Sequence, residues 1–239
     1  MKTMEHIYFV NAHPDDLCAV MGTALKLSRK KNCRLHVVDL THGERSLVGK
    51  IAPEECAKMR SAEESEVCRK LGADIVWLDE ADGAAFASES GCRKLAELYL
   101  AEPPHAIITQ WPLDRHLDHT AAADTALQAL RIASGLSEGQ MTGSWPEVLF
   151  YHYLRNSMAD SPNCFVPLNE EEMKRKEEMI GLYRSQSPVW LFREEREINI
   201  FYGQKLGVPY AEALTRLQPL TRLQPLTPGK LSILEALES

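Results

Sequence analysis

Two short segments of this 239-residue chain concentrate side chains that bind metals or move protons. The first segment is residues 12–16, Ala-His-Pro-Asp-Asp, and the second is residues 114–119, Asp-Arg-His-Leu-Asp-His. Imidazoles and carboxylates are the usual ligands of zinc in hydrolases, and they are also common general acids and bases. The side chains of this kind in the two segments are His13, Asp15, Asp16, Asp114, His116, Asp118 and His119.

Both segments follow an apolar, β-rich run and precede a helical pattern. Residues 5–12 and 105–111 predict strands, and residues 17–31 and 120–131 predict helices. Open α/β sheets bind ligands at the carboxyl ends of their parallel strands. The two polar segments are therefore expected to meet at one edge of a sheet.

Each segment also has a structural interpretation when it is taken alone. Asp15 or Asp16 can cap the following helix, because a carboxylate there accepts free backbone N–H groups. A single His after a strand more often has a structural, hydrogen-bonded role than a role as a metal ligand. The second cluster makes the purely structural interpretation the less favoured one.

The residue types favour a hydrolytic site with one metal ion. Such zinc sites have three protein ligands and an open position, and a nearby carboxylate accepts a proton. Asp15 and Asp16 are adjacent, so one can bind the metal while the other faces the substrate water. His116 and His119 need not both be ligands, and Asp118 between them can orient a His.

The rest of the chain supplies the strands and helices that position these segments. Strand and helix patterns alternate, which predicts an α/β fold with a mostly parallel, doubly wound sheet and helices on both faces. His36 lies inside a predicted strand, and we expect it to be structural. Further strands are expected at 34–40, 74–79, 147–153 and 164–167, and further helices at 53–71, 88–101, 169–183 and 194–206.

We expect one α/β domain at residues 1–214 and an irregular extension at 215–239. The extension contains the hexamer Thr-Arg-Leu-Gln-Pro-Leu twice, at 215–220 and 221–226. Two copies of six residues are too few and too short for a solenoid. No function is assigned to this duplication.

Composition excludes several classes of function. The chain has 27 basic and 34 acidic residues, a formal charge of −7, so we expect no nucleic-acid partner. It has no apolar run of membrane-spanning length and no signal-peptide pattern. The six cysteines are scattered without a C-x-x-C pair, which indicates reduced, buried thiols in a cytoplasmic protein.

The two motifs resemble those of the PIG-L/LmbE-like zinc-dependent de-N-acetylases. That family has A-H-P-D-D-E near the N-terminus and H-P-D-H after the fourth strand; this chain has Leu17 in place of the Glu and Leu117 in place of the Pro. The resemblance implies a Rossmann-like α/β sandwich. The segments 41–44 and 207–212, with Arg60-x-x-Glu63, are most similar to the subgroup that deacetylates N-acetylglucosaminyl-malate in bacillithiol synthesis.

The resemblance also implies roles for the two motifs. It implies that His13, Asp16 and His119 hold zinc, with Fe(II) as the alternative ion, and that Asp15 is the general base. His116 is expected to stabilise the oxyanion of the tetrahedral intermediate.

Three further residues acquire roles in the same way. Asp118 is expected to orient His116 and, by raising its pKa, to keep its imidazole protonated. Arg60 and Asp82 are expected to bind the sugar.

The expected activity is removal of an N-acetyl group from an N-acetylglucosamine-type small molecule. The alternatives are an amidase that acts on a thiol–sugar conjugate or another N-acetylated metabolite, and a non-catalytic module that keeps the fold. A nucleotide-binding protein is disfavoured, because residues 12–16 stand where G-x-G-x-x-G would follow the first strand. Some relatives form hexamers, so the resemblance allows a homo-oligomer.

Overall fold

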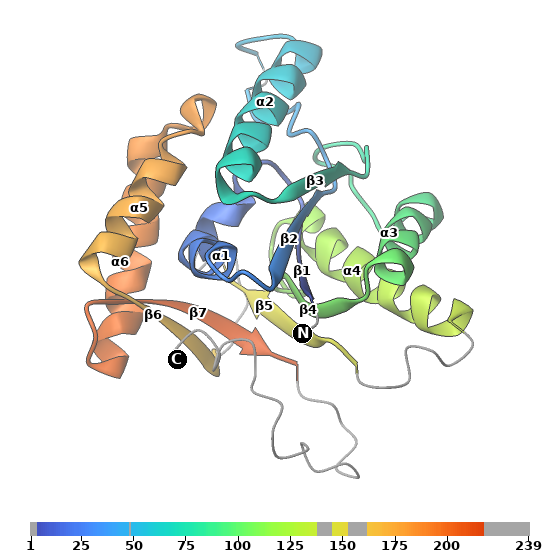
Figure 1. Cartoon of the computed structure of the whole chain (residues 1–239). Helices are drawn as coiled ribbons and strands as arrows, with labels where there is room; N and C mark the ends of the chain where they lie inside the picture. The colour runs from blue at the N-terminus through green and yellow to red at the C-terminus, as the bar shows by residue number, and fades with distance from the viewer. Residues whose placement is uncertain (1–3, 48, 138–144, 153–161, 218–239) are drawn as a thin grey trace.

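A seven-stranded sheet runs through the protein, with the strand order β3-β2-β1-β4-β5-β7-β6 (Figure 1). Neighbouring strands from β3 to β5 are parallel, whereas β7 is antiparallel to both β5 and β6. The structure, a computed structural model, describes residues 4–47, 49–137, 145–152 and 162–217. Its strands are β1 Glu5–Asn11, β2 Cys33–Asp39, β3 Asp74–Trp77, β4 Pro104–Gln110, β5 Glu147–Tyr151, β6 Cys164–Leu168 and β7 Tyr210–Arg216.

Helices cover both faces of this sheet, as the sequence predicts. Helices α3 and α4 lie on one face, and α1, α2, α5 and α6 lie on the other (Figure 1). The described residues also form two short 3-10 helices, η1 Asp16–Val20 and η3 Arg184–Gln186. The α-helices are α1 Met21–Ser28, α2 Pro53–Leu71, α3 Glu89–Ala101, α4 Leu117–Leu136, α5 Glu170–Ile180 and α6 Pro188–Leu206.

The central strands are apolar on both faces because each face belongs to a separate core. In β1, Ile7 and Phe9 pack with the α1 and α2 side, whereas Tyr8 and Val10 pack with the α3 and α4 side. All four side chains are fully buried. A parallel sheet between two helical layers requires this near-continuous apolar pattern.

The strand order places the two polar segments side by side. The chain runs outward from β1 through β2 to β3, and β4 then returns to the other flank of β1. Ligands bind in open α/β folds at such a reversal, outside the carboxyl ends of the strands. Residues 12–16 follow β1, and residues 114–119 span the end of the β4–α4 loop and the first turn of α4, so both flank the reversal.

The first helix differs from its prediction. The expected helix 17–31 is a 3-10 turn, η1, followed by the short helix α1. Asp15 adopts a left-handed backbone with φ 90°, and neither Asp15 nor Asp16 makes the expected side-chain cap. Asp15 is bound instead by Arg60, and the Asp16 carboxylate accepts from the backbone N–H of His13 and from Gln110.

Two later helices begin earlier than expected. Helix α4 begins at Leu117 rather than at residue 120, which puts Asp118 and His119 in its first turn. Helix α6 begins at Pro188, a residue type that suits the first turn of a helix. Helix α2 matches its prediction from Pro53 to Leu71, and Gly72 ends it with φ 68°.

Strand β7 was not predicted. Its sequence contains the buried Glu212, which interrupts the apolar pattern of a central strand. Because β7 continues to Arg216, the sheet includes the first residues of the first hexamer copy, beyond the expected boundary at 214. The second copy, at 221–226, lies outside the described residues.

Two further expectations from the sequence concern cysteines and membranes. All six cysteines are free thiols, and Cys18, Cys56, Cys68 and Cys92 are buried. In the described part of the chain, none of the helices combines the length and apolar character that crossing a bilayer requires.

Candidate active site and metal centre

The candidate site lies where β1 and β4 end, and the Gln110 side chain joins the two strand ends. Its amide oxygen accepts from the backbone N–H of Ala12 at 2.9 Å, and its amide nitrogen donates to Asp16 Oδ2 at 2.8 Å. Gln110 is fully buried at the last position of β4. Sequence reasoning missed this residue, although a polar side chain at the end of an apolar strand was the available signal.

Three side chains converge as a candidate metal centre. His13 Nδ1 lies 3.2 Å from Asp16 Oδ2, and His119 Nε2 lies 3.6 Å from Asp16 Oδ1. One ligand atom from each of the three residues falls within 4.8 Å of the other two, and all three residues are buried. Two imidazoles and one carboxylate match the ligand types of catalytic zinc sites.

A carboxylate lies behind each of the two imidazoles. His13 Nε2 lies 3.1 Å from Asp118 Oδ2, and His119 Nδ1 lies 3.3 Å from Asp114 Oδ2. Histidine ligands of metals commonly donate their second ring nitrogen to a carboxylate, which fixes the tautomer and the ring orientation. The ring nitrogens that face Asp16 are thus set up as ligands, and the residues present fit a metal ion.

The acidic and imidazole side chains of this cluster shift each other's pKa values toward the charged forms. Burial lowers the pKa of His13, but Asp16, Asp118 and Asp82 outweigh burial and raise that pKa well above its usual value. Burial raises the pKa of Asp16, but the imidazoles of His119 and His13 outweigh it and lower that pKa. This lowered pKa favours an ionised Asp16 carboxylate in the three-residue centre.

Asp15 faces a different partner from Asp16. Arg60 Nη2 donates to Asp15 Oδ1 at 2.6 Å, and the Asp15 backbone N–H donates to Glu64 Oε2 at 3.1 Å. Burial raises the pKa of Asp15 to about 6, against the lowering effect of Arg60. The left-handed φ of Asp15 is strained for a non-glycine residue, and such strain is concentrated at functional sites.

Arg60 and Asp82, which we expected to bind the sugar, both contact the site. The Arg60 guanidinium also donates to the backbone carbonyls of Pro14 and Gly43, and it is 3% exposed. Asp82 Oδ1 lies 3.3 Å from His13 Nε2, and Asp82 Oδ2 accepts from the Arg45 N–H at 2.7 Å. The structure thus gives each residue a partner in the site, and sugar binding stays a prediction.

The structure places the hydrogen bonds of Asp118 on partners other than His116. The Asp118 carboxylate contacts His13 and accepts from the backbone N–H groups of Gly83 and Ala85, at 2.6 and 3.1 Å. Helix α4 begins one residue before Asp118, which turns this side chain inward, whereas His116 at the N-cap stays exposed.

The pKa of His116 is also shifted in the direction opposite to our expectation. Burial, followed by the neighbouring His119 and His13, lowers this pKa, and the raising effect of Asp118 is weaker. The His116 ring stacks on His119 at a centroid distance of 4.6 Å and lies edge-on to His13 at 4.9 Å. The lowered pKa favours a neutral imidazole at His116, beside the centre.

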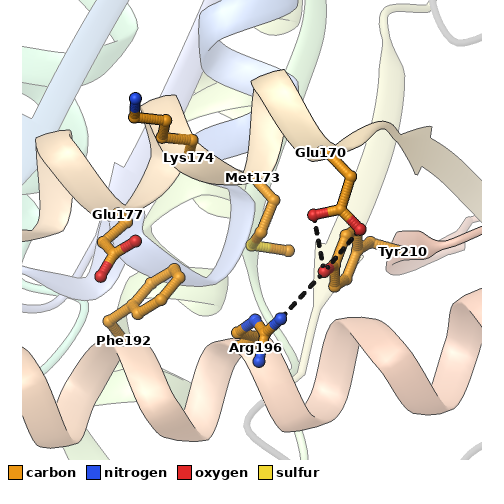
Figure 2. Close-up of a pocket in the computed structure, with 7 residues that line it drawn as sticks. All are labelled: Glu170, Met173, Lys174, Glu177, Phe192, Arg196 and Tyr210. Atoms are coloured by element: carbon orange, nitrogen blue, oxygen red, sulfur yellow. Dashed lines mark hydrogen bonds between the residues drawn. The ribbon is translucent and has the colours of Figure 1, made fainter.

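A pocket of about 280 Å³ lies elsewhere, between α5, α6 and the start of β7 (Figure 2). Its polar groups bind each other: the Tyr210 hydroxyl donates to Glu170 at 3.0 Å and accepts from Arg196 at 3.1 Å. It contains none of the predicted site residues. The lining residues are Glu170, Met173, Lys174, Glu177, Phe192, Arg196 and Tyr210.

The sequence profile of the PIG-L family, described as GlcNAc-PI de-N-acetylase, matches residues 8–130. This match spans more than half of the chain and includes both motifs. The chain belongs to the PIG-L family. It is thus a member of a family of de-N-acetylases, and its fold is the one expected from the resemblance.

Solved structures share this fold over most of the chain. N,N'-diacetylchitobiose deacetylase from Pyrococcus horikoshii is 24% identical, with TM-score 0.76, over 93% of this chain and 88% of that one. The conserved protein TT1542 from Thermus thermophilus is 26% identical, with TM-score 0.71, over 92% of this chain and 98% of that one.

A third structure with the same fold has a different chemistry in its name. GalB, the 4-carboxy-2-hydroxymuconate hydratase from Pseudomonas putida, is 21% identical, with TM-score 0.77, over 93% of this chain and 100% of that one. A fold does not specify one reaction. The reaction of this chain therefore has to be argued from its site.

Proposed function

We propose that this PIG-L family member is a metal-dependent amide hydrolase that removes the acetyl group from an N-acetylglucosamine-type small molecule. The observation that carries the proposal is the buried centre of His13, Asp16 and His119, with the separate carboxylate of Asp15 beside it. A hydrolytic centre needs both a set of ligands and a proton acceptor that is not a ligand.

His13, Asp16 and His119 would hold the ion, with Zn²⁺ as the first choice and Fe²⁺ as the alternative. When bound, such an ion polarises the acetyl carbonyl and acidifies water. The carboxylates of Asp118 and Asp114 keep the two imidazoles oriented for this task.

Asp15 is proposed to move the proton. Its Oδ1 is held by Arg60 at 2.6 Å, which leaves Oδ2 to accept a proton from the water that attacks the acetyl carbon. Asp15 then delivers that proton to the amide nitrogen as the C–N bond breaks, and the products are acetate and the free amine. Arg60 favours the ionised form of Asp15, which a base requires.

His116 is proposed to stabilise the developing oxyanion as a neutral N–H donor. Its exposed position beside His119 suits a group that meets the substrate, and its lowered pKa favours the neutral form over the cationic form we expected. Loss of one such donor typically costs about 10²–10³-fold in kcat. His116→Ala should therefore keep its metal and lose activity, whereas a large loss of metal would identify His116 as a ligand.

For the substrate, we propose the subgroup activity on N-acetylglucosaminyl-malate. Two exposed arginines support an anionic aglycone. The backbone N–H and Nη1 of Arg45 both donate to Asp82, and Arg115 directly precedes His116. Their guanidinium groups suit bidentate contacts to the malate carboxylates.

Acetate release from a panel of acetylated sugars tests the proposal. The panel holds N-acetylglucosaminyl-malate, a neutral methyl N-acetylglucosaminide and N,N'-diacetylchitobiose, each assayed with zinc-loaded, iron-loaded and chelator-treated protein. We expect metal-dependent acetate release, with the highest kcat/KM for the malate conjugate. Absence of acetate from every sugar with stoichiometrically loaded protein would overturn the proposed hydrolysis. A preference for a neutral sugar would overturn only the subgroup assignment.

A further inference from the structure

A second cluster of metal-ligating side chains lies at the opposite end of the strands. His6 is the second residue of β1, whereas the candidate active site begins after Asn11, the last residue of β1. At about 3.3 Å per residue, the two ends of this strand are roughly 20 Å apart. We propose that His6, His36 and Glu102 form a second site, which binds one divalent transition-metal ion.

The ligand atoms already converge. His6 Nδ1 lies 3.0 Å from His36 Nε2, and His36 Nε2 lies 3.6 Å from Glu102 Oε2. One ligand atom from each residue falls within 4.8 Å of the other two. Zinc holds imidazole nitrogens at about 2.0–2.1 Å, so two nitrogens on a tetrahedral ion are roughly 3.3 Å apart. The observed 3.0 Å requires only a small opening of this pair.

The surrounding side chains hold His36 in a ligand orientation. Its ring stacks on Tyr8 at a centroid distance of 4.4 Å and an interplanar angle of 14°. Its Nδ1 faces Asp74 Oδ2 at 3.6 Å, which favours the proton on Nδ1. The Nε2 lone pair then accepts from His6 Nδ1 at 3.0 Å, and a bound ion would replace the proton that these two nitrogens share. A carboxylate behind a histidine ligand is the usual supporting arrangement in metal sites.

Glu102 is fixed at both its backbone and its carboxylate. The Tyr8 hydroxyl donates to the Glu102 backbone carbonyl at 2.9 Å, and Arg34 Nη1 lies 3.3 Å from Glu102 Oε1. Oε1 is therefore occupied by the guanidinium, and Oε2 is the oxygen that faces the imidazole. The positive charge of Arg34 opposes ion binding, but two acidic side chains, Glu102 and Asp74, flank it.

The donor set specifies the kind of ion. Two imidazoles and one carboxylate suit Zn²⁺ and its neighbours among the transition metals, whereas Mg²⁺ and Ca²⁺ prefer oxygen-only sets. Ions can reach the cluster because the Glu102 side chain is 35% exposed, although the His36 side chain is only 6% exposed. Three elements far apart in the sequence, β1, β2 and the C-cap of α3, would share one ion.

Calorimetric titration of the full, chelator-treated chain with Zn²⁺ tests this site separately from the active site. The reference is the His13→Ala/His119→Ala double variant, in which two of the three active-site ligands are removed. We expect this variant to bind one equivalent of Zn²⁺, and the further change Glu102→Gln or His36→Gln to abolish that equivalent. Asp74→Asn should weaken it by about 10- to 100-fold.

His42→Gln, added to the same double variant, is the matched control. His42 also pairs with a carboxylate, Asp79 at 2.9 Å, but the cluster that would share an ion does not include it. Binding should be unchanged in this control. The proposal is overturned if Glu102→Gln and His36→Gln leave the equivalent intact, or if His42→Gln reduces it equally.

Two features keep the outcome interpretable. Circular dichroism establishes that each variant is folded, and the partly exposed Glu102 at the end of α3 provides a substitution that spares the core.

In wild type we expect two equivalents of Zn²⁺. A single equivalent that is lost with Glu102→Gln would support this second site while refuting the proposed active-site metal.

Discussion

At the scale of single residues, adjacent carboxylates have separate partners. Asp16 lies among His13, His119 and Gln110, whereas Asp15 binds Arg60. The left-handed φ of Asp15 is the local cause, because it changes the chain direction between the two side chains. The strain is held in place by Arg60 and by Glu64, which accepts the Asp15 N–H.

Asp15→Asn tests the division of tasks between these carboxylates. We expect the variant to retain one active-site metal, because Asp15 belongs to no metal-ligating group among the described residues. Turnover should fall by about 10²–10⁴-fold, the usual contribution of a general base. Metal content and kcat measured on the same sample check both parts. Lost metal with unchanged activity per bound ion would instead make Asp15 a ligand.

We predict that Glu64 makes a pH-dependent contribution to the stability of the folded protein. Burial raises its pKa to about 7, above the ordinary value of about 4.3 in an unfolded chain. Because the pKa of Glu64 is higher in the folded than in the unfolded protein, its contribution to folding stability is complete below the unfolded-state pKa. That contribution is lost as the pH rises through 7. The loss amounts to roughly 1.4 kcal/mol per pH unit between the two values.

Glu64→Gln should remove this loss while its amide oxygen still accepts the Asp15 N–H. Urea unfolding at about pH 5 and about pH 7.5, on either side of the raised pKa, should show a smaller decrease in unfolding free energy for the variant than for wild type. A chelator is present throughout. Glu66→Gln on the same helix, at a partly exposed position, is the control. Equal pH dependence in Glu64→Gln and wild type would contradict the prediction.

At the scale of elements, helix α2 packs closely against the turn after β2 at Gly43. This glycine has φ 66°, and a Cβ there would lie 1.9 Å from Arg60 Nη1. Arg60 in turn donates to the Gly43 carbonyl and to Asp15. The turn therefore needs glycine both for its backbone conformation and for the space that Arg60 occupies.

Gly43→Ala should displace Arg60 and lower kcat by about 10²-fold, the scale for a misplaced catalytic group. Gly72→Ala is the matched control, because Gly72 has φ 68° but no atom within 4 Å of the position that a methyl group would take. Both variants should lose about 1–2 kcal/mol of stability to the left-handed backbone. Equal kcat in the two variants would contradict the role of the Arg60 contact.

At the scale of the whole molecule, a buried ion network joins the last third of the chain to the first. Lys176 of α5 contacts Glu212 of β7 at 2.8 Å and Glu195 of α6 at 3.0 Å. Glu212 also accepts the backbone N–H groups of Gly22 and Thr23, both at 2.7 Å, at the start of α1. The C-terminal elements thereby fix the helix that follows the first motif.

Lys176→Met should destabilise the protein by about 3–5 kcal/mol, because it leaves buried carboxylates without their cation. Lys176 is fully buried, and although burial lowers its pKa, Glu212 and Glu195 outweigh burial and raise it. Lys174→Met, an exposed position on the same helix, should cost less than about 0.5 kcal/mol. Urea unfolding measures both changes, and similar stability of the two variants would contradict the network's role.

The fold class and the two segments that form the candidate site could be predicted from local patterns in the sequence. Apolar strands that alternate with amphipathic helices are such patterns, and so are Pro53 and Gly72 at the ends of α2. The position of both motifs after apolar strands predicted their meeting at one sheet edge. The structure brings His13, Asp16 and His119 together there.

The partner of each charged group, by contrast, depended on the tertiary structure. Asp118 binds His13 rather than its sequence neighbour His116, because helix α4 begins earlier than its pattern indicates. Strand β7 escaped prediction because the cation that compensates Glu212 is Lys176, which lies 36 positions away. The second cluster, which includes His36, likewise comes from three separate elements. Contacts between residues distant in sequence leave no local pattern. These partners could therefore be identified only from the tertiary structure.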